Sequence, residues 1–302
     1  IIKMSITLKN KDLLPFWVGF SCLRHIGPKR FQKIFSFFRG DLEKAWSAPV
    51  SEYISCGFEP KLASQICNDQ RQIDLGKKME ELKKNNIEAV IITDPRYPKL
   101  LKQIYDPPFV LYVRGKIEIF SKPCLAVVGT RKHSVYGKKV LEHLVSQLAS
   151  LDWIIVSGLA LGIDSLAHQV ALENGSTIAV IPSGLDDNCI CPSRNLGLAH
   201  RIMQNGALVS EHPPGKPPER YTFVIRNRII SGLCLGSLII EAPEQSGALL
   251  TASASLEQNR EVFSVPGDIF SETSLGTNKL IQQGAKMVTS ISDILDVFNL
   301  GI

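Results

Sequence analysis

The sequence predicts an α/β fold: a doubly wound, mostly parallel sheet with helices on both faces, preceded by a smaller helical unit. Short apolar runs alternate with helical segments from residue 124 onward, and this order requires parallel strands joined by right-handed crossovers. The runs are apolar throughout, which is typical of strands buried on both faces. By contrast, the first 86 residues contain only segments with helical spacing. We therefore expect a helical domain over 1–86 and a sheet domain over 87–302.

The expected elements of the sheet domain follow one another regularly. Residues 87–115 indicate an introductory strand, helix and strand. Seven strands are then expected at CLAVVG, WIIVSG, TIAVIP, ALVSE, SLIIEA, EVFSVPG and KMVTS. The helices between and after them are expected from about Val135 and at 163–175, 196–206, 224–234, 248–259, 276–284 and 291–298. The proline-rich stretch HPPGKPPERY is expected to be a loop.

Two segments of the helical unit share a pattern. LRHIGPKRFQKIF and ISCGFEPKLASQI each place an apolar residue and a glycine in a turn, followed by a basic residue and a helix. The pattern resembles helix-hairpin-helix or SAM-like modules, whose turn amides can contact phosphate. The alternative is a helix-turn-helix unit that serves packing alone, and the sequence leaves both interpretations open.

Composition excludes several classes of protein. The chain has 302 residues with 44% apolar content, which suits a folded protein with a large core. No run reaches the roughly 18 apolar residues of a membrane helix, and the N-terminus has no signal-like apolar stretch. Seven scattered cysteines indicate reduced thiols in the cytoplasm. Since Cys189 and Cys191 form a lone CxC, we expect no metal site.

The net charge of +5 is unevenly distributed. Residues 1–120 carry 20 Lys and Arg against 13 Asp and Glu, whereas residues 121–302 carry 14 against 16. An anion site in the second part must therefore depend on local placement. One basic group is Arg131, Lys132, Lys138 and Lys139, in a stretch without carboxylates from 121 to 141. The other is Lys216, Arg220, Arg226 and Arg228, interrupted by Glu219 alone.

Glycine turns follow four of the expected strands, at the sheet edge where doubly wound folds bind ligands. They are Gly129, Ser157 with Gly158, Ser183 with Gly184, and Ser246 with Gly247. In AVVGTRKHSVYG, the strand, turn and helix predict a phosphate cradle at the helix N-terminus. This stretch matches neither the dinucleotide motif GxGxxG nor the P-loop motif. The predicted ligand is anionic, but it is not bound in an ordinary NAD or ATP site.

Three titratable residues near these turns have structural explanations. Asp164 is well placed to cap a helix, and His168 suits a hydrogen-bonded position near the core. Glu241 ends a strand without a second carboxylate beside it, which is weak support for acid catalysis.

In RYTFVIRNRIISG, arginine forks suit phosphate oxygens and Phe223 suits a stacked base. Alternatively, these arginines pair with structural carboxylates and Phe223 fills the core.

Taken together, the motifs resemble the DNA-processing protein A family (DprA, also called Smf). They run in order over residues 97–286, from YPKLLKQIYDPPFVLYVRG through AVVGTRKHSVYG, IVSGLALGIDSLAH, FVIRNRIISGL and EAPEQSGALLTA to GTNKLIQQGA. The resemblance implies an extended Rossmann-like domain after a SAM-like domain. It also implies a non-enzymatic, cytoplasmic homodimer without a cofactor. Such a protein binds single-stranded DNA and loads RecA onto DNA displaced from single-strand binding protein during recombination in natural transformation (competence).

The resemblance, the glycine turns and the basic groups together give the candidate DNA- and phosphate-binding residues, among which Arg226 and Arg228 are the ones most open to a structural role. The set is Gly129, Thr130, Arg131, Lys132, Ser157, Gly158, Gly184, Arg220, Phe223, Arg226, Asn227, Arg228, Gly247 and Arg260. Two departures from the family pattern are Cys191, where a tyrosine is common, and the lack of a winged-helix segment after residue 298. The alternative function is a nucleotide phosphoribohydrolase on a related core, but the PGGxGT-type run of those enzymes is missing from this sequence.

Overall fold

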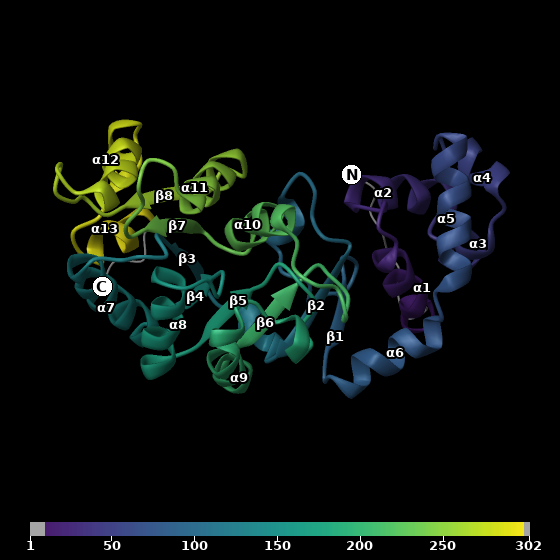
Figure 1. The fold of residues 1–302 in the computed structure, drawn as a ribbon, viewed down its shortest axis with the longest axis horizontal. Coiled ribbons are helices and arrows are strands. Elements are labelled where there is room, and N and C mark those ends of the chain that lie inside the picture. The colour runs from purple at the N-terminus through teal and green to yellow at the C-terminus, as the bar shows by residue number, and fades with distance from the viewer. Residues whose placement is uncertain (1–9, 299–302) are drawn as a thin grey trace.

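The computed structural model describes residues 10–298. Residues 1–9 and 299–302, which belong to the two predicted domain ranges, lie outside the described residues. The described chain forms a row of short helices followed by a single sheet with helices packed against it (Figure 1). Within it, the sheet has nine strands in the order β1-β2-β6-β5-β4-β3-β7-β8-β9.

Six helices precede the first strand. They are α1 (Asn10–Cys22), α2 (Pro28–Phe37), α3 (Leu42–Ser47), α4 (Val50–Ser55), α5 (Pro60–Gln72) and α6 (Leu75–Lys84). Apolar contacts join this helical unit to the β1–β2 edge of the sheet, where Phe31 stacks on Phe109 with ring centroids 3.9 Å apart. Ser21 Oγ lies 2.5 Å from the hydroxyl of Tyr112, whose side chain is fully buried. The helical unit therefore shares a hydrophobic core with the sheet.

The strands carry the predicted apolar runs. They are β1 (Glu88–Ile91), β2 (Val110–Gly115), β3 (Cys124–Val128), β4 (Ile154–Ser157), β5 (Thr177–Val180), β6 (Ala207–Ser210), β7 (Gly236–Ile239), β8 (Glu261–Ser264) and β9 (Lys286–Met287). β1 and β2 pair antiparallel, and β2 is antiparallel to β6. All pairs from β6 to β9 are parallel.

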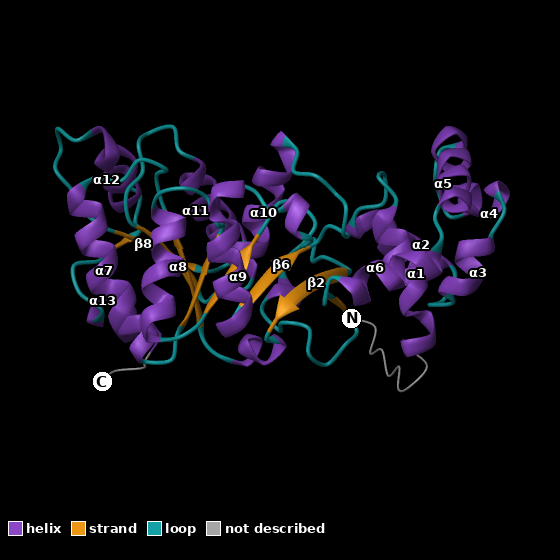
Figure 2. Ribbon diagram, turned by 60° about the horizontal axis from the view of Figure 1, so that its bottom comes forward, coloured by secondary structure: helices purple, strands orange, loops and turns teal. Residues whose placement is uncertain are grey.

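Helices cover both faces of the sheet (Figure 2). One face packs against α7 (Val135–Ser150), α8 (Ile163–Asn174), α9 (Leu196–Asn205) and α13 (Ser292–Leu295). The opposite face packs against α10 (Arg220–Gly232), α11 (Gly247–Glu257) and α12 (Leu275–Gln282). The predicted doubly wound, Rossmann-like α/β fold is confirmed.

The start of α10 differs from the sequence prediction. The helix begins at Arg220 rather than near Val224. Glu219 and Thr222 form a reciprocal capping box, in which the backbone amide of Glu219 donates to Thr222 Oγ1 at 3.0 Å. This capping extends the helix back to the prolines, so that Phe223 lies on α10 rather than in the preceding loop.

The direction of winding reverses at β3. From β3 the chain adds β4, β5 and β6 on one side, and it then returns to add β7, β8 and β9 on the other. The crevice between the carboxyl ends of β3 and β7 is therefore the topological switch point, where open α/β sheets bind ligands.

A candidate nucleic-acid interface

A pocket of about 510 Å³ opens at the switch point. The loop after β3, the loop before α8, helix α10 and the start of α11 all contribute to its wall. Eight of the predicted site residues line it: Gly129, Thr130, Arg131, Lys132, Phe223, Arg226, Asn227 and Gly247. These residues are separated by up to about 120 positions in the sequence, and the parallel sheet brings them together at one edge.

The loop after β3 is held from below by Glu241, which follows β7. The backbone carbonyl of Glu241 accepts a 2.7 Å hydrogen bond from the Thr130 amide. Its buried carboxylate accepts from the Ser134 amide at 2.8 Å and from the Ser134 hydroxyl at 2.6 Å, and Thr273 donates to it at 3.0 Å. Glu241 is thus fully engaged in shaping the loop.

This arrangement changes the prediction of a phosphate cradle at the N-terminus of α7. Ser134 Oγ caps the helix by accepting from the Gly137 amide at 3.0 Å, and the carboxylate of Glu241 takes the anionic position beside it. The loop leaves the side chains of Arg131, Lys132 and His133 exposed. An anion at this turn is therefore expected to bind through the exposed face of the loop rather than through the helix end.

Arg226 and Asp164 are buried side chains of opposite charge in the lining of the pocket, and each influences the other through its charge. Arg226 Nη1 donates to the carbonyl oxygens of Gly158, at 2.7 Å, and Val180, at 2.5 Å. Burial lowers the pKa of Arg226 to about 10, although the carboxylate of Asp164 acts in the opposite direction. Burial also raises the pKa of Asp164, against the influence of Arg226 and of the amides of Ala160, Gly158 and Gly129. Asp164 therefore organises the loops instead of facing the solvent.

Helices α10 and α11 form the other wall of the pocket. Phe223 is half-buried, and Asn227 Nδ2 donates to the carbonyl oxygen of Gly247 at 3.4 Å, which ties the two helices together. Ser246 caps α11 by accepting from the Ala248 amide at 3.3 Å. Gly247 is exposed, and a side chain there would meet open space. Phe223 is the aromatic ring available to a ligand in this pocket.

Three predicted residues lie beneath the pocket. Ser157 is fully buried and donates to the Val127 carbonyl at 2.7 Å. The Gly158 amide donates to the carboxylate of Asp164 at 3.2 Å, and the Gly184 amide donates to the Lys216 carbonyl at 2.8 Å. A Cβ atom at Gly158 would collide with the Arg226 guanidinium. These residues shape the carboxyl edge from inside the protein.

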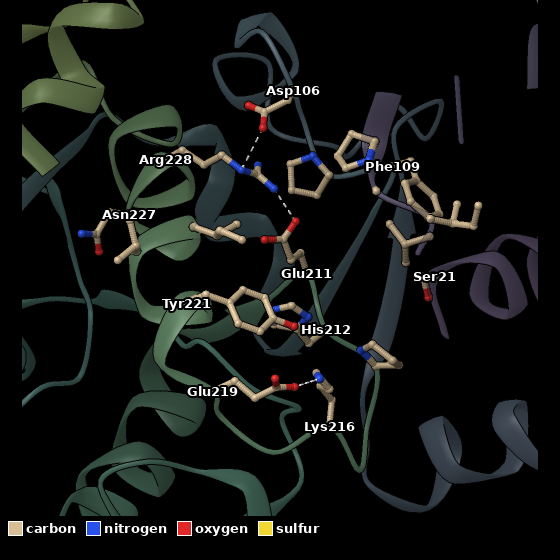
Figure 3. A pocket seen from close by; sticks show the side chains of 18 of the residues that line it. Ser21, Asp106, Phe109, Glu211, His212, Lys216, Glu219, Tyr221, Asn227 and Arg228 are labelled. Atoms are coloured by element: carbon tan, nitrogen blue, oxygen red, sulfur yellow. Dashed lines mark hydrogen bonds and ion pairs between the residues drawn. The ribbon is translucent and has the colours of Figure 1, made fainter. Parts of the chain in front are cut away.

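The remaining three predicted arginines lie apart from the pocket lining. Arg220 is exposed at the start of α10. Arg228 pairs with Glu211, and its Nε lies 3.3 Å from Asp106 (Figure 3). Arg260 precedes β8 and therefore lies at the opposite, amino edge of the parallel sheet, where its Nη2 donates to the Leu100 carbonyl at 3.1 Å. The structural alternative that the sequence left open thus describes Arg228, whose two neighbours are carboxylates.

Other residues clarify the chemistry of the described chain. His168 is fully buried, its Nδ1 lies 2.7 Å from Thr177 Oγ1, and burial lowers its pKa to about 3.

Sequence reasoning missed Val224 and Leu250, which line the pocket although they are exposed apolar residues. Between residues 10 and 298, no group of three or more His, Cys, Asp or Glu side chains could hold a metal ion. None of the helices described is long and apolar enough to cross a membrane.

The fold and the pocket define a class of protein: a Rossmann-like protein with a cationic, aromatic-walled crevice at its switch point. The chain belongs to the DNA recombination-mediator protein A family, whose pattern it matches over residues 88–299. This confirms the resemblance to DprA and Smf proteins.

Relatives and solved structures agree with this assignment. The chain is 38% identical to DNA processing protein DprA of Bacillus subtilis, over 87% of this chain and 89% of the relative. It is 36% identical to protein Smf of Synechocystis, over 93% and 71% of the two chains. The structure of DNA processing protein A from Streptococcus pneumoniae superposes with a TM-score of 0.79 at 34% identity, covering 96% of this chain and 98% of that one. The Helicobacter pylori protein, whose structure was described for its single-stranded DNA binding mode, gives 0.64 at 30% identity, covering 70% and 95%.

Proposed function

We propose that this protein is a recombination mediator that binds single-stranded DNA at the switch-point pocket. The exposed side chains of Arg131 and Lys132 contact backbone phosphates, together with Thr130, which precedes them in the same loop. Phe223 stacks on a base. Arg220 adds a phosphate contact at the start of α10. The observation that carries the proposal is the convergence of two exposed cations and one aromatic ring in a single pocket.

The carboxylates near the pocket support a binding function rather than an enzymatic one. Asp164 accepts hydrogen bonds from loop amides beside Arg226, and Glu241 accepts from Ser134 and Thr273. A general acid or base has to reach a proton on the substrate. Asp164 is buried in the pocket lining and Glu241 is buried behind the loop, and both accept hydrogen bonds from the protein itself. Incubation with AMP tests the phosphoribohydrolase alternative, because catalytic release of adenine would contradict the proposal.

The wider cellular role belongs to the same proposal. The chain acts in the cytoplasm as a homodimer, displaces single-strand binding protein, and loads RecA onto incoming DNA during natural transformation. The family description as recombination mediators supports the recombination step. The edge strand β9, where Met287 is 51% exposed, supports pairing of two copies, because an uncovered strand edge is a template for association.

Fluorescence anisotropy with labelled oligo-dT and its duplex tests the binding proposal. We expect sequence-tolerant, single-strand-selective binding whose log affinity falls by about 0.7 per phosphate contact for each log unit of salt. Arg131→Ala should weaken binding to the single strand by about tenfold or more, since it removes an exposed cation from the pocket.

The matched control is Lys139→Ala. Lys139 is also exposed, but it lies on α7 and does not line the pocket. Equal affinities of the Arg131 and Lys139 variants would show that the loss of one positive charge, rather than its position at the switch point, determines binding. Unchanged affinity in Arg131→Ala would contradict the proposed site.

A further inference from the structure

A second cavity, of about 820 Å³, lies next to the switch-point pocket, between the helical unit and helices α10 and α11. We call it the interdomain groove. The turn between α1 and α2 forms one bank, including Arg24, Gly27 and Pro28. On the other bank, Tyr221 and Arg228 of α10 extend toward it together with Glu211 and His212 from the segment after β6 (Figure 3). The proposed function uses none of these side chains.

Helix α10 separates the groove from the switch-point pocket. One face of the helix lines the pocket, and a neighbouring face lines the groove. On each face the lining residues have the spacing i, i+3, i+4 and i+7, which places residues on one side of a helix. The pocket face consists of Phe223, Arg226, Asn227 and Ile230, and the groove face consists of Tyr221, Val224, Ile225 and Arg228. Val224, Asn227 and Leu250 line both cavities. A linear polymer that leaves the pocket across these shared residues passes directly into the groove.

Exposed apolar and aromatic side chains line this part of the groove. Val224 (54% exposed) and Leu250 (45%) line both cavities, and Tyr221 (47%) lines the groove beside them. Bases that leave a stacked helix present apolar faces of this kind, and aromatic or aliphatic side chains bind them without regard to sequence. The surface formed by Tyr221, Val224 and Leu250 is therefore suited to contact the bases of an unstacked strand.

Three of the four carboxylates that line the groove already lie beside cations, which reduces their repulsion of a polyanion. Asp106 and Glu211 flank the guanidinium of Arg228, and Glu219 pairs with Lys216. Arg24, which reaches across from the helical unit, also contributes to the lowered pKa of Glu219, after the larger effect of Lys216. Glu257 is the remaining carboxylate among the lining residues.

The segment that contains this bank is strongly basic, and among its cations Arg24 lines the groove. From residue 13 to residue 40 the chain contains no Asp or Glu and five cations: Arg24, Lys29, Arg30, Lys33 and Arg39. Arg24 lines the groove, and Lys29 Nζ lies 3.6 Å from the ring centroid of Tyr105. The charge excess of the N-terminal part is thus concentrated in a segment that includes the turn facing α10.

We propose that the interdomain groove is a second single-stranded nucleic-acid subsite. A strand held at the switch-point pocket crosses Val224 and Leu250, and the phosphates that follow contact Arg24 in the groove and then Lys29, which follows the lining residue Pro28. The inference rests on the proposed function, because the first part of the strand is held at the pocket. It assigns to the helical unit the role of extending the footprint on the strand.

Binding of strands of two lengths tests the inference. Anisotropy is measured with oligo-dT of about 5 and about 20 nucleotides, which bracket common footprints, using the full chain carrying Arg24→Glu and Lys29→Glu. We expect affinity for the long strand to fall by about tenfold or more and its salt slope to decrease by about 1.4, the value for two lost phosphate contacts. Affinity for the short strand should change by less than about twofold, because the pocket alone holds it.

The matched control replaces the exposed lysines Lys44 and Lys61 by Glu, since they lie on α3 and α5, away from the turn between α1 and α2 that lines the groove. If the groove variant and this control bind the long strand equally, the inference is wrong. Arg131→Ala with the short strand tests the proposed function separately. If it weakens that binding while the groove variant does not weaken binding of the long strand, only the inference fails. If Arg131→Ala has no effect, the proposed function fails, and the inference fails with it.

Discussion

Replacing Arg226 by Met should destabilise the protein strongly, although the sequence also makes this residue a candidate DNA contact. The substitution keeps a long apolar stem and removes the guanidinium. Two carbonyl oxygens, those of Gly158 and Val180, then lose a donor, and the buried carboxylate of Asp164 loses its neighbouring positive charge. Leaving two buried carbonyl oxygens without this donor and a buried carboxylate without a nearby cation should cost about 3–5 kcal/mol in total, a large part of a typical free energy of unfolding.

Urea denaturation measures this cost. With a slope of about 3 kcal/mol per molar urea for a chain of this size, the midpoint should fall by about 1–2 M. Adding Asp164→Asn to the variant should recover about 1–3 kcal/mol, since the unpaired buried charge is then removed. A cost below about 1 kcal/mol, or a double variant no more stable than the single one, would refute the assignment of a buried pair.

The same variant has a predictable dependence on pH. Burial already raises the pKa of Asp164 in the folded protein, and loss of Arg226 raises it further. A raised carboxyl pKa stabilises the folded state at low pH, and this stabilisation is lost as pH rises through the folded value. The cost of Arg226→Met should therefore be smaller at about pH 5 than at about pH 8. An identical cost at both would contradict the reasoning.

Three further predictions concern single residues. Phe223→Ala should lower the affinity for single-stranded DNA by about 1–3 kcal/mol, measured by anisotropy, while Phe223→Tyr retains most of it. Arg260→Ala should leave that affinity unchanged within about twofold, because Arg260 lies at the amino edge of the sheet; a loss as large as that in Arg131→Ala would show a DNA path across this edge. Burial holds the pKa of His168 at about 3, below its unfolded value. The free energy of unfolding should therefore fall as pH drops below about 6.5, by about 3 kcal/mol near pH 4. Urea titrations should show a weaker pH dependence in His168→Leu over this range.

The order of strands and helices could be predicted because each run carries its own signal. The apolar run 124–128 and the helical pattern after Ser134 need no distant partner to be recognised, and both form as expected. Carboxyl ends of parallel strands share one edge, which brings Gly129 and Gly247 into one pocket. The capping box at Glu219 was missed because its two residues look like ordinary loop and helix residues in the sequence.

The roles of individual charges could not be predicted in the same way. Ser134 and Glu241 are 107 positions apart, and their contact depends on the pairing of β3 with β7. Arg226 and Arg228 are two residues apart on one helix, so they point in different directions. Arg226 is buried in the pocket lining, and Arg228 faces Glu211. A local pattern of Arg, Asn and Arg carries no information about which neighbouring strand will supply a carboxylate.

Under the proposed function, affinity and strand selectivity have separate origins in this pocket. Arg131 and Lys132 are exposed cations, and a phosphate backbone offers them the same charge in single and double strands. Phe223 lies in the pocket wall and can stack only on a base whose face is free, which a paired and stacked duplex does not offer. Removal of a cation should therefore weaken binding to both forms of DNA, whereas removal of the ring should weaken binding to the single strand alone. A mediator that must follow DNA of any sequence needs both features, because charge alone would leave it bound to duplex DNA.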